Sequence, residues 1–148
     1  MTGRQRRPLP AGRVDAGGTM WRLRSLLVMG HDCARIARAL GVPPQAVQRL
    51  VAGRTLSVTP QFRALAVRLW DAWWDKTPPD GTPEQRRAAA LARRHAKARD
   101  WPAAAALDED QLDEPGYRPW SHYRPATGTG TAAPFTPDAP VRQARRIA

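Results

Sequence analysis

The chain has 148 residues, of which 15 are proline and 11 are glycine, so we expect one modest domain with flanking tails. The formal net charge is +11, and residues 1–60 hold ten arginines against two aspartates, a balance that attracts polyanions. One cysteine excludes an internal disulfide framework and a cysteine-based zinc site, and the longest apolar run other than alanine, Leu26–Met29, is too short to span a membrane.

Residues 1–18 are rich in Arg, Pro and Gly and hold almost no apolar side chain to bury, so we expect a disordered basic arm. Such an arm either stays solvated or enters a DNA minor groove. Order is expected to begin at Thr19, the N-cap of a first helix that ends at Gly30. The apolar face of that helix comprises Met20, Leu23, Leu26 and Leu27.

Two short helices are expected next. Asp32 caps the first of them and Gly41 ends it, with Ile36, Ala37 and Leu40 turned inward and Arg35 and Arg38 outward. After a tight turn, Pro44 opens the second, in which Val47 and Leu50 are buried, and Gly53 ends it. Two short helices joined by a glycine-containing turn are the physical unit of the helix-turn-helix, which we assign to residues 19–58.

Two supporting helices are expected in residues 59–100. Thr59-Pro60 starts one that runs to about Lys76, and its broad apolar stripe comprises Phe62, Leu65, Leu69, Trp70, Trp73 and Trp74. We expect this stripe to form core, or a homodimer interface through Trp70, Trp73 and Trp74. A capping box at Thr82–Gln85 starts the other helix, which runs to about Arg99. Its thin apolar face comprises Ala88, Leu91, Ala92 and Ala96.

Residues 101–148 are expected to form an acidic stretch followed by a disordered tail rich in Pro and Gly. The acidic residues Asp108–Asp110 and Asp113-Glu114 either contact another protein or shield the chain's own arginines. No alternating strand pattern and no internal repeat is visible. The sequence therefore predicts an all-α fold, with a three-helix helix-turn-helix domain followed by two further helices and disordered termini.

A resemblance narrows this interpretation. Leu23–Arg54, containing Ile36–Val42 and Val47–Leu50, resembles the helix-turn-helix domains of prokaryotic repressors and recombinases. The longer block Arg22–Pro125, with Asp71–Lys76 and Leu107–Asp110 in similar places, resembles small helix-turn-helix DNA-binding proteins of actinobacteria and their phages. Such proteins commonly place Ser or Thr immediately before the recognition helix, where this chain has Pro43.

The resemblance implies that the helix after Pro43 enters the DNA major groove. Its base-edge candidates are Pro44, Gln45, Gln48 and Arg49. Gln pairs with adenine and Arg with guanine in that groove, so Gln48 and Arg49 are the favoured readers of sequence. The candidates for phosphate contacts, which fix register and affinity, are Cys33, Arg35, Arg38 and Arg54.

No catalytic constellation, metal-ligand spacing or cofactor motif is visible, so we expect a non-enzyme that is cytoplasmic and nucleoid-associated. The favoured function is sequence-specific binding of double-stranded DNA by a transcriptional regulator. One alternative is an accessory factor in recombination or in phage or plasmid maintenance, and another is an adaptor that docks on the transcription machinery. The helix dipole at Cys33 lowers the pKa of its thiol, which favours reactivity, but the chain holds no partner cysteine, so a small helix-start residue near a phosphate is favoured over a redox switch. We expect His31, His95 and His122 to lie at or near the surface.

Overall fold

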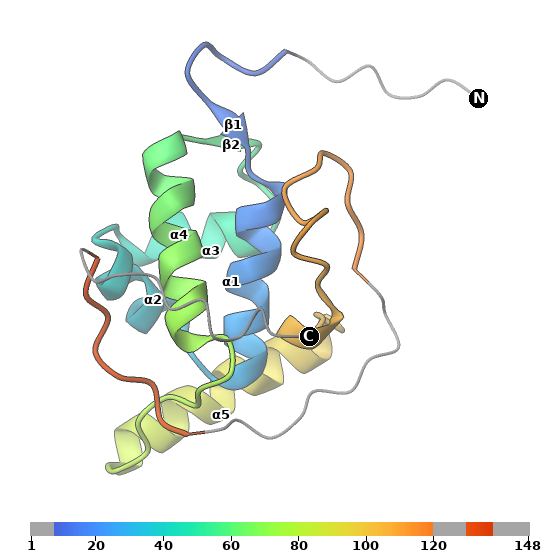
Figure 1. Ribbon diagram of the computed structural model, residues 1–148. Coiled ribbons are helices and arrows are strands. Elements are labelled where there is room, and N and C mark those ends of the chain that lie inside the picture. Colours follow the sequence, from blue (N-terminus) through green and yellow to red (C-terminus); the bar gives the residue numbers. More distant parts are fainter. Residues whose placement is uncertain (1–7, 120–129, 138–148) are drawn as a thin grey trace.

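The computed structural model describes residues 8–119 and 130–137, and this part of the chain is mostly helical (Figure 1). Its α-helices are α1 (Gly17–Met29), α2 (Cys33–Leu40), α3 (Pro44–Val51), α4 (Pro60–Trp73) and α5 (Pro83–Ala98). A short 3-10 helix, η1, covers Ala104–Ala106, and two strands, β1 (Val14–Asp15) and β2 (Ser57–Val58), pair in an antiparallel sheet. The five helices agree with the all-α expectation, whereas the sequence pattern does not predict the small sheet.

The helix α1 is the centre of the core. Leu23, Leu26 and Leu27 are at most 2 % exposed, because α1 packs against α3, α4 and α5. Figure 1 shows α1 and α4 side by side, with α5 running across one end of α1. Other large, wholly buried side chains are Trp70, Ile36, Leu50, Leu69 and Leu112. Removal of this apolar surface from water stabilises the fold and fixes α2 and α3 against α1 and α4.

The starts of α4 and α5 follow the expected side-chain caps, whereas Asp32 occupies the N-cap position of α2 without a side-chain cap hydrogen bond. The Thr59 hydroxyl accepts a hydrogen bond from the Phe62 amide, and Thr82 and Gln85 form the predicted capping box. The prediction that Thr19 caps α1 is wrong, because α1 begins at Gly17 and Thr19 is wholly buried inside the helix. The Asp15 carboxylate accepts a hydrogen bond of 2.9 Å from the amide of Gly17, the first residue of α1. This bond stabilises the turn that leads into the helix, before the predicted start at Thr19.

The expectation of a disordered arm is wrong for residues 8–18. Val14 pairs with Val58 and Asp15 with Ser57, and the Arg13 Nε donates a 2.8 Å hydrogen bond to the Ser57 hydroxyl. A two-residue strand is too short to give an alternating pattern, so its order depends on a partner far along the chain. The remainder of the predicted arm, residues 1–7, lies outside the described residues.

The expectation of a mobile tail is wrong for residues 130–137, and the acidic stretch that precedes the tail also packs on the fold. In residues 101–119, Leu112 is wholly buried, and Asp113 forms an ion pair with Arg22 on α1 at 2.7 Å. In residues 130–137, the Ala133 carbonyl accepts a 2.9 Å hydrogen bond from the indole of Trp73, and Phe135 meets the same ring edge-on. The ion pair between Arg22 and Asp113 therefore holds the acidic stretch against α1. Residues 120–129 and 138–148, also assigned to the tail, lie outside the described residues.

The aromatic stripe of α4 faces the interior. Trp70 and Trp73 are each 2 % exposed, and the Trp70 indole donates a 2.8 Å hydrogen bond to the Ser25 hydroxyl. Two of the three tryptophans suggested for a homodimer interface are therefore inside the molecule, and only Trp74 is half-exposed. The expected face of α5 is also corrected, because Ala89, Ala92 and Ala96 are buried whereas Leu91 is 61 % exposed.

The expectation that His31 lies near the surface is wrong. Its ring is wholly buried and stacks on Trp73 with the ring centroids 4.7 Å apart. The His31 Nε2 lies 2.8 Å from the Lys76 carbonyl, and the Arg35 Nε donates a hydrogen bond to Nδ1. Burial first, and then the charges of Arg35 and Arg93, lower the pKa of His31 to about 4 against a raising effect of the Lys76 carbonyl. A neutral imidazole therefore links α2 to the end of α4.

Candidate nucleic-acid interface

The helices α2 and α3 pack against each other and are joined by a three-residue turn, residues 41–43. Gly41 has φ +70, a left-handed conformation that glycine adopts without the steric cost of a Cβ. The Val42 amide then donates a 3.0 Å hydrogen bond to the Ala37 carbonyl, which closes the end of α2. Pro43 is extended and Pro44 is the first residue of α3, where proline loses no helical hydrogen bond.

The helix α3 is amphipathic across its eight residues. Val47, Leu50 and Val51 are at most 2 % exposed and face the core. The opposite side carries the four base-edge candidates, Pro44, Gln45, Gln48 and Arg49, all of which are exposed. We call these four residues the outer face of α3. As predicted from the spacing, the apolar residues are inside and the polar ones face solvent.

Arg24, which was not among the residues singled out from the sequence, restrains the end of α3, because its Nε donates a hydrogen bond to the main-chain oxygen of Val51. Arg24 on α1 lies between two indole rings, with its guanidinium carbon 4.8 Å from the Trp21 centroid and 4.9 Å from the Trp101 centroid. Burial lowers the pKa of Arg24. Because Trp101 is distant in the sequence, no local spacing indicates this arrangement.

The phosphate candidates divide into two groups. Arg38 on α2 and Arg54, just beyond α3, are exposed. Arg35 is half-exposed, because its guanidinium lies 4.3 Å from the Trp73 ring centroid and contacts His31. Stacking on a buried aromatic ring is favourable for a guanidinium, and it restrains the Arg35 side chain.

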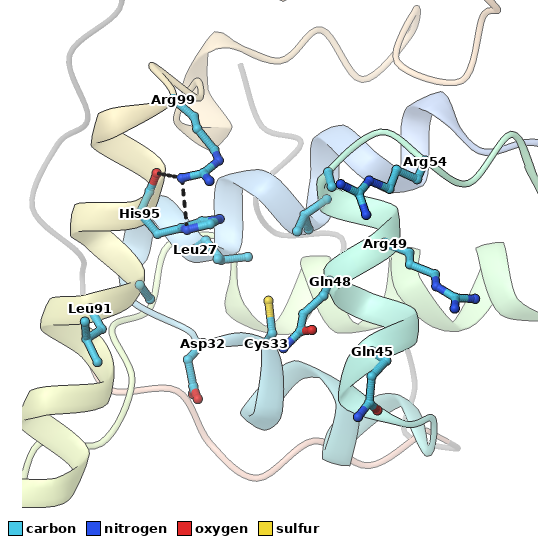
Figure 2. A pocket seen from close by; sticks show the side chains of 13 residues that line it. Leu27, Asp32, Cys33, Gln45, Gln48, Arg49, Arg54, Leu91, His95 and Arg99 are labelled. Carbon is cyan, nitrogen blue, oxygen red and sulfur yellow. Dashed lines mark hydrogen bonds between the residues drawn. The ribbon is translucent and has the colours of Figure 1, made fainter.

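Cys33 is half-buried at the start of α2. Burial, and then the charge of Asp32, raise the pKa of its thiol to about 11. The expectation of a low-pKa, reactive thiol is therefore wrong, because desolvation and a neighbouring carboxylate oppose the effect of the helix dipole. The Cys33 side chain lies beside Gln48 as a neutral group (Figure 2).

A groove of about 630 Å³ separates α3 from α5. Its α3 side includes Gln45, Gln48 and Arg49, and its α5 side includes Leu91, His95 and Arg99 (Figure 2). The sequence pattern of α5 predicts only a supporting helix, so this second wall of the groove is a finding of the structure.

In the described residues, no group of three or more His, Cys, Asp or Glu side chains is placed to hold a metal ion. The helices of the same part of the chain are all too short or too polar to cross a membrane. No family model, curated protein or solved structure matches the chain.

Proposed function

We propose that the chain is a helix-turn-helix protein that binds double-stranded DNA sequence-specifically through the outer face of α3 and regulates transcription. The observation that carries this proposal is the exposure of Gln45, Gln48 and Arg49 on one side of a short helix whose other side is buried. An α-helix with its side chains is about 10–12 Å wide, which matches the roughly 12 Å width of the major groove.

The chemistry of the outer face suits direct readout of bases. A glutamine amide forms a bidentate pair with adenine, and a guanidinium forms one with guanine, each contributing roughly 1–3 kcal/mol of discrimination. In this proposal Gln48 and Arg49 read bases, and Gln45 and Pro44 line the same face. The rigid turn at Gly41 and the burial of Val47 and Leu50 hold that face in place without using any of its polar groups.

Charge around the outer face favours a polyanion. Arg38 precedes the turn and Arg54 follows α3, so exposed guanidinium groups flank the helix on both sides in the sequence. A protein that neutralises several phosphates releases condensed counterions, and its affinity for DNA therefore falls steeply as salt rises. The whole-chain net charge of +11 also attracts a polyanion.

The test is equilibrium binding of the full chain to a random-sequence duplex across a salt series. The proposal predicts binding at low salt and a linear fall of log K with log salt. The slope is expected to be about −0.9 for each phosphate contacted. Arg54→Ala is expected to reduce that slope by about one. The matched control is Lys97→Ala, which removes one exposed charge from α5 at a position that does not line the groove. Absence of binding at low salt contradicts the proposal and favours an adaptor that docks on protein.

Genome-wide mapping of bound sites separates the regulatory role from the accessory role. Sites that overlap promoters agree with transcriptional regulation. Sites confined to attachment or replication sequences contradict that part of the proposal and leave DNA binding itself intact.

A further inference from the structure

The groove between α3 and α5 has one wall that belongs to the proposed base-reading helix and another that does not. The second wall is formed by Leu91, His95 and Arg99 on α5 and its C-cap, and Figure 2 shows His95 and Arg99 extending toward α3, with Leu91 over the α5 ribbon. All three are exposed, and Leu91 is 61 % exposed despite being apolar.

The charge of the groove is predominantly positive. Arg49, Arg54 and Arg99 line it, against one carboxylate, Asp32. The Arg99 guanidinium contacts the His95 ring at 3.0 Å and the His95 carbonyl at 3.4 Å, and no carboxylate of the described residues forms an ion pair with it. Its positive charge is therefore not neutralised within the described part of the fold.

His95 orients this arginine. Burial first, and then the charge of Arg99, lower the pKa of His95, so its ring is neutral near pH 7. A neutral Nδ1 accepts a hydrogen bond, and the Arg99 Nη1 lies within reach to donate it. The Trp101 ring, 5.9 Å from the Arg99 guanidinium carbon, restricts the same side chain from another side. A guanidinium held in this way loses less conformational entropy when it binds an anion.

We propose that this groove receives the sugar-phosphate backbone of one DNA strand, with Arg99 as a phosphate ligand and Leu91 against the deoxyribose. The inference rests on the proposed function. When the outer face of α3 occupies the major groove, the backbone that borders that groove runs beside α3, and α5 is the element that shares a groove with α3 on its Gln48 side. The protein thereby clamps one strand between two helices, and α5 is part of the interface.

A charge placed in the groove tests the proposal without disturbing the core. Leu91→Glu puts a carboxylate into the groove at a site that is already exposed. Like charges brought together across an interface are unfavourable, so we expect affinity for every duplex to fall at least about tenfold at low salt. The matched control is Ala90→Glu, which adds the same charge to the same helix at an exposed residue that does not line the groove. We expect a much smaller loss from Ala90→Glu.

A second variant removes the proposed ligand itself. Arg99→Ala is expected to reduce the dependence of log K on log salt by about 0.9, as one lost phosphate contact requires, and to weaken all sequences alike. Arg99→Lys restores the charge and is expected to recover most of the salt dependence. Helical circular dichroism of each variant, measured beside the wild type, shows whether the fold is retained.

The outcomes separate the inference from the proposed function. If the wild type binds duplex DNA and both Leu91→Glu and Arg99→Ala bind as tightly and with the same salt dependence, α5 does not contact the backbone and the inference fails alone. If folded wild-type protein does not bind duplex DNA at low salt, the proposed function fails and the inference fails with it.

Discussion

The Nε of Arg24 donates a 2.7 Å hydrogen bond to the main-chain oxygen of Val51, the last residue of α3. The last carbonyl groups of a helix have no partner within the helix and carry its negative partial charge. A guanidinium at that place satisfies one of them and opposes the dipole. The arginine is itself held between Trp21 and Trp101, so α1 and the segment after α5 together fix the end of the helix that carries the proposed base readers.

We predict that Arg24→Ala lowers the free energy of unfolding by about 2 kcal/mol, the usual contribution of a hydrogen bond from a charged group. It is also expected to weaken binding to all duplexes alike, because α3 loses its fixed end and not a base contact. Urea denaturation followed by circular dichroism measures the first effect. Unchanged stability relative to the Lys97→Ala control means that Arg24 does not restrain α3.

The turn between α2 and α3 depends on the left-handed conformation of Gly41. A Cβ added there meets no atom within 4 Å, so the cost of Gly41→Ala is backbone strain alone. We expect a loss of about 1–2 kcal/mol in the free energy of unfolding, and a smaller loss for Gly41→Asn, because asparagine tolerates this conformation better. Gly81→Ala is the control, since Gly81 has no positive φ and its added Cβ has an ordinary contact. Equal denaturation midpoints for Gly41→Ala and Gly81→Ala contradict the assignment.

Burial of His31 makes the fold sensitive to acid. The folded-state pKa is about 4, below the ordinary value of 6.5, so the unfolded chain binds more protons between these two values. The stabilising effect of the neutral ring is therefore complete above pH 6.5 and is lost as pH falls toward 4. The free energy of unfolding is expected to fall by up to about 1.4 kcal/mol per pH unit in that window.

The hydrogen bonds of His31 explain why the fold favours the neutral ring. The Lys76 carbonyl can only accept, so Nε2 carries the proton, and Nδ1 accepts from Arg35. A second proton on Nδ1 removes that acceptor and places a positive charge beside a guanidinium. Urea denaturation at pH 7 and pH 4.5 is expected to show a large difference for the wild type and for His95→Gln, and a much smaller one for His31→Gln. Equal pH dependence in wild type and His31→Gln contradicts the account.

The ion pair between Arg22 and Asp113 holds the acidic stretch against α1. The two groups meet in two hydrogen bonds of 2.7 and 2.9 Å, and the Arg22 side chain is 6 % exposed. Loss of the partner of a wholly buried charge costs about 3–5 kcal/mol; because the Asp113 side chain is 38 % exposed, we expect about 2 kcal/mol for Asp113→Asn.

The control for this pair is Asp110→Asn, which changes an exposed carboxylate in the same stretch. The hydrogen bond from Arg22 lowers the pKa of Asp113 against an opposing effect of burial, so its contribution is present above the ordinary pKa of 3.8 and lost in stronger acid. Thermal denaturation near pH 7 compares the variants. A melting temperature of Asp113→Asn equal to that of Asp110→Asn rules out a stabilising role of the pair.

Features determined by neighbouring residues could be predicted from the sequence. Gly41 and Pro44 bound α2 and α3, and Thr59 and Thr82 start α4 and α5, because capping and backbone preferences act over a few residues. The outer face of α3 followed from helical periodicity in the same way.

Features determined by distant contacts could not be predicted. His31 is buried because Trp73 and Lys76 on a later segment cover it, and the half-exposed Arg35 stacks on the Trp73 ring. The Arg24 site needs Trp101, and β1 needs β2. The prediction that Leu91 lies on the buried face of α5 is wrong. The face that packs on α1 is formed by the small side chains of Ala89, Ala92 and Ala96, and Leu91 lies outside it.

The most direct test of the central claim, that the outer face of α3 reads DNA sequence, is selection of bound duplexes from a random pool by wild type and Gln48→Ala in parallel. The account predicts an enriched motif for the wild type, and for Gln48→Ala the same motif with relaxed preference at one base position. Arg38→Ala is the matched phosphate control, expected to keep the motif and lose overall affinity. Absence of any enriched motif, or an identical motif and preference for wild type and Gln48→Ala, contradicts the claim.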